Sequence, residues 1–331
     1  MGKLKWLLNY ASQKRVRPPF IFEILAFFID LVIKFVTLDK VRFSFKRFFK
    51  TNRILFKSEC SNSDEGLGLE ILFVSTQKDF QLLPLAIEFA LNSTSDFSVL
   101  SITVITPDKY VSEVKNLTRD FEVTVEGESL YFDEDALRKL KNTFPGRFGW
   151  VLQQLLKLQF VLSSKASGVL IIDSDTILLE KRKWLGIDGS QLLTPTWEYH
   201  KPYYEFLNSV GICKINPEYT FVSHHMLMQP KIVNELFEYV GWKDIADLID
   251  FISSMSIGDE QSPFSLDYEL YAQYLYKNYP GNVVLGKWSN KAVARNSGID
   301  DINLEISKES LKNSNRFASL SFHSYLKAKA P

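Results

Sequence analysis

From Leu69 onward, short runs of apolar residues alternate with longer segments in which apolar side chains recur every three or four positions. Short apolar runs between polar residues predict buried strands, and the longer periodic segments predict helices. In the first half, strands are expected at residues 69–74, 99–105, 121–125 and 168–172, and helices at residues 80–91, 134–141 and 150–163. Strands that alternate with helices at this spacing predict an α/β fold with a mostly parallel sheet flanked by helices.

The second half of the chain is less regular, but it carries the same two kinds of pattern. Strands are expected at residues 191–196, 221–228, 283–285 and 318–322, and helices at residues 231–239, 245–255 and 266–277. In open α/β sheets, ligands bind beyond the carboxyl ends of the strands. The first candidates for a site are therefore the polar residues that follow strands, namely Ser75-Thr76, Thr106-Pro107-Asp108 and Asp173-Ser174-Asp175.

Residues 1–60 differ from the rest, because Lys and Arg are mixed there with Phe, Ile and Leu. This segment holds 13 basic and 4 acidic residues, whereas the whole chain has a net charge of zero. A polar, glycine-containing stretch at residues 58–68 indicates a linker. We therefore expect a basic, amphipathic helical extension over residues 1–60 and one domain over residues 69–331.

The apolar run at residues 20–36 is interrupted by Glu23, Asp30 and Lys34, and it is shorter than the roughly 20 mostly apolar residues of a membrane span. No cleavable signal peptide is visible. An apolar run with basic flanks favours peripheral binding to an anionic membrane surface. Packing on the domain, or an oligomer contact, fits the same pattern. The expected location is the cytoplasm, with the inner face of the cell membrane as an alternative.

Composition narrows the function further. With 331 residues, 46% hydrophobic and 24% charged, the chain can bury a large core, and disorder is excluded. Its two cysteines, Cys60 and Cys213, exclude a disulfide framework or a cysteine zinc site. No glycine-rich loop follows the first strand, which argues against P-loop and dinucleotide enzymes.

The strongest chemical signal is Asp173-Ser174-Asp175, because a buried apolar strand delivers two carboxylates at its carboxyl end. A turn beginning at Ser174 would bring both carboxylates to one ligand. Paired carboxylates at such a position suit a hard cation such as Mg²⁺ or Mn²⁺, which takes oxygen ligands and substrate phosphates. Two solvated acids at a turn are the alternative.

Three blocks of sequence carry a resemblance to known enzymes. They are Phe144-Pro145-Gly146-Arg147-Phe148-Gly149-Trp150, Gln153-Gln154-Leu155-Leu156-Lys157 and Ile171-Ile172-Asp173-Ser174-Asp175. The chain resembles glycosyltransferases of the GT-A (Rossmann-like) fold, and more narrowly a bacterial group associated with surface polysaccharides. The likeness extends over about residues 69–326.

The resemblance implies a donor site. In such enzymes the Asp-x-Asp motif binds a divalent cation, Mn²⁺ or Mg²⁺, which holds the diphosphate of a nucleotide-sugar. A basic residue on the preceding helix commonly contacts the donor, and the loop after the first strand holds the nucleotide. The donor-binding residues implied in this chain are Thr76, Lys78, Arg147, Gln154, Lys157 and Ser174.

The resemblance also implies a third metal ligand from a late histidine. His323 follows a short apolar run near the C-terminus and is the residue expected to join Asp173 and Asp175. An imidazole beside carboxylates suits Mn²⁺. A surface histidine near a frayed chain end is the alternative.

On the acceptor side, an acid near the start of the helix at residues 266–277 is implied to contact the acceptor or to act as general base. Glu269 is favoured over Asp267, and the one that acts is expected to face the cleft on the side away from Lys157. Stabilising the helix dipole is the alternative role for these acids. His224 and His225 are candidate acceptor contacts, and adjacent residues of a strand point to opposite faces, so one of them is expected in the core.

The sequence thus predicts a metal-dependent glycosyltransferase with a nucleotide-sugar donor, a glycan or lipid-linked acceptor and no nucleic-acid partner. One alternative is a phosphohydrolase of the haloacid-dehalogenase type, although about 170 residues precede the acidic motif and Ile177 stands at its fifth position. The other is a non-catalytic protein that binds a nucleotide-sugar.

Overall fold

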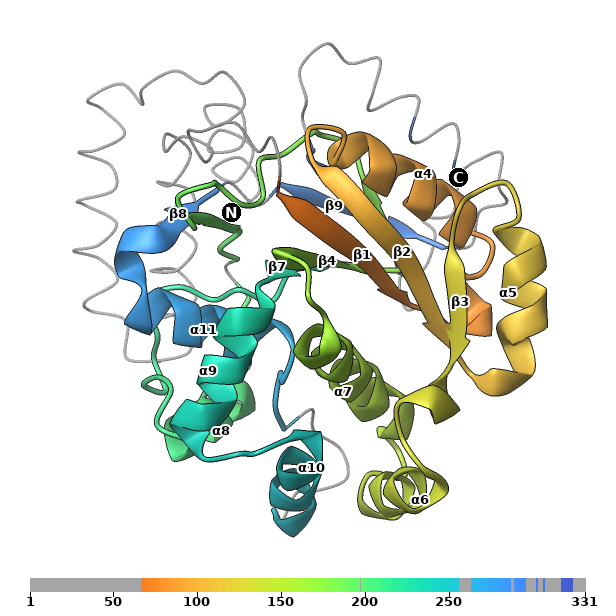
Figure 1. The fold of residues 1–331 in the computed structure, drawn as a ribbon. Coiled ribbons are helices and arrows are strands. Elements are labelled where there is room, and N and C mark those ends of the chain that lie inside the picture. The colour runs from red at the N-terminus through yellow and green to blue at the C-terminus, as the bar shows by residue number, and fades with distance from the viewer. Residues whose placement is uncertain are drawn as a thin grey trace, which may run out of the picture.

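The computed structural model describes residues 67–196, 198–255, 263–286, 289–295, 302, 306 and 317–323. Its centre is a five-stranded sheet in the order β3-β2-β1-β4-β7 (Figure 1). These strands are β1 (Gly68–Val74), β2 (Ser98–Thr106), β3 (Thr124–Gly127), β4 (Gly168–Asp173) and β7 (His225–Met228). The first four run parallel to one another, and β7 pairs antiparallel with β4. The expected α/β fold with a mostly parallel sheet is confirmed.

Alternate residues of the central strands face two separate hydrophobic cores. Leu72 and Val74 of β1 belong to one core, whereas Ile71 and Phe73 belong to the other. Successive side chains of a strand point to opposite faces, and here both faces are covered. Nearly every position of β1 and β4 is therefore apolar, as expected for central parallel strands.

Helices cover both faces of this sheet (Figure 1). α4 (Leu83–Ser93) contributes to the core that contains Phe73, and α7 (Phe148–Ser163) contributes to the core that contains Leu72. The other α-helices are α5 (Val111–Leu117), α6 (Glu134–Thr143), α8 (Lys201–Ser209), α9 (Pro230–Val240), α10 (Ile245–Ser254) and α11 (Tyr268–Asn278). Short 3-10 helices are η2 (Gln77–Asp79), η3 (Asp108–Tyr110), η4 (Glu128–Leu130) and η5 (Pro280–Asn282).

Two smaller sheets complete the described fold. One has the order β5-β10-β9, and the other pairs β6 with β8. Their strands are β5 (Thr176–Leu178), β6 (Gln191–Leu193), β8 (Val283–Leu285), β9 (Asn290–Ala294) and β10 (Ser319–His323). β10 runs antiparallel to β5 and parallel to β9. Since β5 directly follows Asp175, this pairing brings the end of β10 to the acidic motif.

Two strands expected in the second half are shorter than predicted. The run at residues 191–196 forms a strand only over Gln191–Leu193, and the apolar run at residues 221–228 forms one only over His225–Met228. Phe221 and Val222 instead donate their backbone N–H groups to the carboxylate of Glu269, so they are not available for a strand ladder. The sequence pattern did not predict α5, α8, β5 or β9. Residues 1–60, expected to form the basic extension, lie outside the described residues.

Within the part of the chain that the structure describes, no helix combines the length and the apolarity that crossing a membrane requires.

Candidate metal centre

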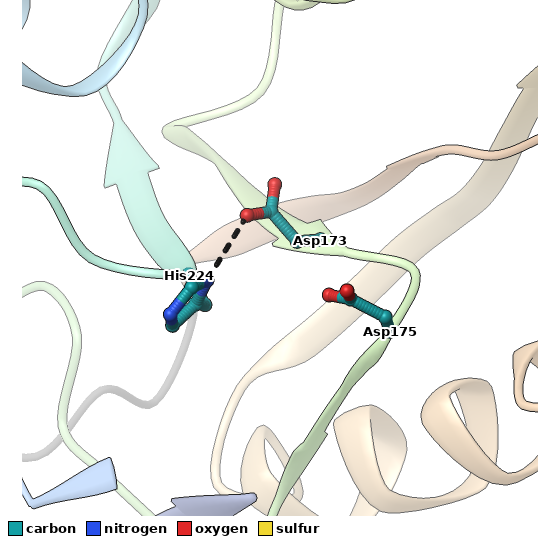
Figure 2. Close-up of side chains that lie close together, drawn as sticks. All are labelled: Asp173, Asp175 and His224. Atoms are coloured by element: carbon teal, nitrogen blue, oxygen red, sulfur yellow. Dashed lines mark ion pairs between the residues drawn. The ribbon is translucent and has the colours of Figure 1, made fainter. Parts of the chain in front are cut away.

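Three side chains that could hold a metal ion meet at the carboxyl end of β4. Asp173 is the last residue of β4, Asp175 immediately precedes β5, and His224 immediately precedes β7 (Figure 2). Each residue offers one ligand atom, and these atoms all lie within 4.8 Å of one another. Two carboxylates and one imidazole at such spacing fit a divalent cation such as Mn²⁺. These three residues are called the metal cluster below.

Strand pairing places His224 beside Asp173. β7 runs antiparallel to β4, and the backbone N–H of Asp173 donates to the carbonyl oxygen of His224 at 2.9 Å. The two side chains also meet, with Nδ1 of His224 3.5 Å from Oδ2 of Asp173. Burial, the largest influence, lowers the pKa of His224. The hydrogen bond and charge of Asp173, with the charges of Asp175 and Glu198, outweigh burial and raise that pKa.

His323, the expected third ligand, lies next to the metal cluster. Its Nδ1 is 3.7 Å from Oδ2 of Asp175, and its ring centroid is 5.0 Å from that of His224. The β10–β5 pairing holds it there, since the N–H of Phe322 donates to the carbonyl oxygen of Asp175 at 2.9 Å. The histidine whose ligand atom converges with those of Asp173 and Asp175 is His224, which the sequence analysis assigned to acceptor binding. His323 is a neighbour of this group on the Asp175 side.

The other oxygen of Asp173 is held from inside the protein. Oδ1 lies 2.8 Å from Nζ of Lys157 and accepts a hydrogen bond from the hydroxyl of Tyr268 at 2.7 Å. Lys157 also contacts Oδ2 of Asp267 at 2.9 Å, and its Nζ lies 4.5 Å from the ring centroid of Tyr268. Asp267 in turn accepts from the N–H of Tyr268 at the start of α11. Asp173 is thus tied to α7 and to α11.

In this buried network, Lys157 and Asp173 shift the pKa of each other. Burial favours a neutral Asp173, but the charge of Lys157 and the contacts of His224 outweigh it and hold the pKa of this carboxyl well below its usual range. Burial likewise favours a neutral Lys157, yet Asp173 and Asp267 raise its pKa well above the ordinary value. Burial is the main reason why the pKa of Tyr268 is raised, so the phenol stays protonated and donates.

Ser174 fixes the turn between the two acids. Its hydroxyl donates to Oδ2 of Asp79 at 3.1 Å and lies 3.4 Å from the carbonyl oxygen of Val74 at the end of β1. Asp79 is also the acceptor in an ion pair with Arg295, which follows β9. Burial, the largest influence, raises the pKa of Asp79 despite the opposing charges of Lys78 and Arg295. Ser174 is therefore a buried residue that shapes the turn.

The remaining expected donor contacts fall into two groups. Thr76, Lys78 and Arg147 are exposed, at the end of β1 and at the start of α7. Gln154 is buried, and its side chain accepts from the N–H of Leu266 at 2.7 Å. Lys157 is also buried, with 2% of its side chain exposed. Gln154 and Lys157 thus join α7 to the segment before α11.

The two acids expected on the acceptor side are placed differently from the prediction. The acid that acts was expected to face the cleft on the side away from Lys157. Asp267 does not lie on that side, because its side chain forms an ion pair with Lys157. Glu269 was expected to face the cleft, and this needs correction too, because the residue is fully buried. Its carboxylate accepts from four groups, namely the hydroxyl of Tyr204, the N–H groups of Phe221 and Val222, and the side-chain amide of Gln273.

His225 is the core partner of the histidine pair. It is buried, and its ring meets Trp184 edge-on at a centroid distance of 5.3 Å. Burial is the largest cause that lowers its pKa to about 3. His225 is therefore neutral at physiological pH. The expectation that one of the two histidines would pack in the core is confirmed, and the other one lies in the metal cluster.

Sequence reasoning missed three residues around the metal cluster. Tyr268 lies beside the predicted Asp267, but an aromatic residue at the start of a helix usually indicates packing. Asp79 lies in the loop after the first strand, which the sequence analysis assigned to nucleotide binding as a whole. Its being the acidic residue of that loop is the signal that could have singled it out. Arg295 follows the unpredicted strand Asn290–Ala294, which is short and holds Val293 as its one β-branched residue.

No protein-family model and no curated protein matches the chain. Solved structures to which it is similar include mouse xyloside xylosyltransferase 1 in its apo form. That match has a TM-score of 0.44 and 13% sequence identity, and it covers 80% of this chain and 100% of the mouse chain.

Proposed function

We propose that this protein is a metal-dependent glycosyltransferase of the GT-A type that uses a nucleotide-sugar donor. The observation that carries the proposal is the metal cluster at the carboxyl end of β4, where Asp173, Asp175 and His224 bring their ligand atoms within 4.8 Å of one another. A parallel α/β sheet binds ligands at this edge. A cation held there would neutralise the diphosphate and stabilise it as the leaving group.

Different residues around this cation would bind the metal, fix the turn of the acidic motif and contact the nucleotide. Asp173, Asp175 and His224 would hold it, with His323 beside Asp175. Ser174 would keep the two carboxylates on one turn through Asp79. The exposed loop at Thr76 and Lys78 follows the neighbouring strand β1, so it would contact the nucleotide. A lysine there can bind phosphate as a point charge.

Neither acid at the start of α11 is offered as a general base in this proposal. Asp267 is paired with Lys157, and Glu269 is surrounded by four donors. A general base must reach the proton that it removes, directly or through one water molecule. These contacts therefore favour a reaction in which neither acid deprotonates the acceptor. Both acids have a structural role instead.

The test is a panel of nucleotide-sugars incubated with the full-length protein in Mn²⁺, in Mg²⁺ and in excess chelator. We expect release of the nucleoside diphosphate from one class of donor, with Mn²⁺ or Mg²⁺ only. Asp175→Asn should lose this release while its melting temperature stays close to that of the wild type. Release in chelator would contradict metal dependence. Metal-dependent binding of a donor without release, even with glycan acceptors added, would favour the non-catalytic alternative.

The acceptor is proposed to be a glycan or a lipid-linked glycan at the cytoplasmic leaflet. The basic residues of the segment 1–60 support this choice, since 13 Lys and Arg stand there against 4 acids. Each basic residue near an anionic membrane contributes about 1 kcal/mol. In vesicle flotation, the full-length protein should float with anionic vesicles and not with neutral ones, and high salt should release it. Equal flotation with both would contradict electrostatic binding.

A further inference from the structure

Asp173 has two oxygens in different surroundings. Oδ2 is directed toward His224 within the metal cluster. Oδ1 is occupied by two donors from the protein interior, Nζ of Lys157 at 2.8 Å and the hydroxyl of Tyr268 at 2.7 Å. A carboxylate whose second oxygen is fully engaged in this way offers a cation one oxygen and one direction of approach.

Lys157 is itself held in place. Its Nζ contacts Asp173, Asp267 and the hydroxyl of Tyr268, so three acceptors surround the ammonium group in a site from which solvent is excluded. Asp267 is fixed by the N–H of Tyr268 at 2.8 Å. Because Lys157 has no exposed face, the role implied for it by resemblance, a direct contact to the donor, does not fit its position.

We infer that Lys157 and Tyr268, with Asp267 as the anchor of Lys157, are positioning residues that lock Asp173 as a one-oxygen ligand of the cation. We call these three residues the Asp173 clamp. The inference rests on the proposed function, since it concerns the same metal cluster. It assigns the buried end of α11 to metal binding, through residues that never touch the cation or the substrate.

The clamp works by geometry as well as by charge. The hydrogen bond from Tyr268 keeps Oδ1 from rotating into the metal cluster, and the ion pair with Lys157 holds the same oxygen from the protein interior. Groups that orient a metal ligand in this way commonly change metal affinity about 10- to 100-fold when removed. Tyr268→Phe isolates the geometric part, because it removes one hydroxyl and changes no charge.

α11 supplies a matched control. Tyr271 is buried like Tyr268, and its hydroxyl also takes part in two hydrogen bonds. It donates to Oε1 of Gln191 at 2.7 Å and accepts from the N–H of Gln229 at 2.9 Å. Neither partner belongs to the metal cluster. Tyr271→Phe therefore has a similar cost in packing and hydrogen bonding, without a change at Asp173.

The test is a titration of the full-length protein with Mn²⁺ alone, in which electron paramagnetic resonance measures free Mn²⁺. We expect about tenfold weaker binding for Tyr268→Phe and unchanged binding for Tyr271→Phe. A second variant, Lys157→Met with Asp267→Asn, removes one positive and one negative charge together and should weaken binding at least as much. The melting temperature of the metal-free protein, measured alongside, reports folding separately from binding.

Each outcome decides between the alternatives. Wild-type affinity in Tyr268→Phe would overturn the clamp while leaving the proposed function intact. Equal weakening in Tyr268→Phe and Tyr271→Phe would also overturn it, because a general loss of packing would then explain both. A wild-type protein that binds neither Mn²⁺ nor Mg²⁺, the latter measured by its competition with Mn²⁺ or by calorimetry, would overturn both the clamp and the proposed function.

Discussion

Arg295 and Asp79 form an ion pair that joins the end of β9 to the loop after β1. Both side chains are largely buried, and Asp79 also accepts from Ser174 within the acidic motif. Loss of Arg295 would remove the ion-pair partner of a buried carboxylate that also interacts with the charge of Asp175. Breaking a buried pair from one side costs about 3–5 kcal/mol.

The first prediction is that Arg295→Gln lowers the free energy of unfolding by about 3 kcal/mol at neutral pH. Arg138→Gln, which breaks an exposed pair with Asp135, should cost less than about 1 kcal/mol. Urea unfolding measures both variants. The deficit of Arg295→Gln should shrink on acidification, because burial already raises the pKa of Asp79 and loss of Arg295 removes an influence that lowers it, so this carboxyl becomes neutral by binding a proton. It should also shrink when Asp79→Asn is added. Equal losses in the two arginine variants would contradict this account of the pair.

The second prediction concerns Glu269, whose carboxylate accepts from two backbone N–H groups and two side chains. Burial raises the pKa of Glu269, so a neutral side chain is tolerated at this position. An amide still has an oxygen that accepts hydrogen bonds, whereas an apolar side chain has none. Glu269→Gln should keep most of the stability, whereas Glu269→Leu leaves buried donors unpaired and should cost about 3 kcal/mol or more. Thermal unfolding compares the two variants.

The same pair of variants tests the catalytic alternative. If Glu269 were the general base, Glu269→Gln would abolish sugar transfer in a protein that is still folded. We expect the transfer rate of this variant to remain within a few-fold of the wild-type rate.

The third prediction concerns pH. Burial lowers the pKa of His224, but its contact with Asp173 and the nearby charges raise it overall. A proton on His224 competes with the cation, so Mn²⁺ affinity should fall by up to about tenfold per pH unit below the raised value. His224→Gln should bind Mn²⁺ more weakly and with a shallower pH dependence. Calorimetric titration across pH 5–8 measures both, and identical pH profiles would exclude His224 from the ligands.

Without a cation, the linkage has the opposite sign. Because the folded-state pKa of His224 is raised, its contact with Asp173 contributes stability that is fully present below the ordinary histidine pKa of about 6.5. That contribution is lost as pH rises through the folded-state value. Added Mn²⁺ should therefore stabilise the protein most at the alkaline end of the range.

The central strands and the acidic motif could be predicted because they depend on local pattern. An apolar run at residues 168–172 that ends in Asp173 must be buried, and its carboxylate must emerge at the edge of the sheet. The partner of Asp173 could not be predicted in the same way. His224 reaches it because β7 pairs antiparallel with β4, whereas alternating strands and helices predict parallel pairing.

The roles of Lys157 and Asp267 depended on a contact that sequence spacing does not encode. They are 110 residues apart, on α7 and at the start of α11. A lysine within a helix fits a solvated helix face, and an acid at the start of a helix fits a role in stabilising the helix dipole. Only the packing of α11 against the end of β4 shows that the two charges neutralise each other beside Asp173. Charged residues are usually exposed, so the sequence does not indicate that Lys157 and Asp267 are buried.

The most direct test of the central claim is an anomalous difference map from crystals of the protein grown with Mn²⁺ and a nucleoside diphosphate. The account predicts one Mn²⁺ peak within bonding distance of Asp173, Asp175 and His224, with diphosphate oxygens as further ligands and the nucleotide lying over the loop at Thr76 and Lys78. A Mn²⁺ or diphosphate bound elsewhere, with the metal cluster empty, would contradict it.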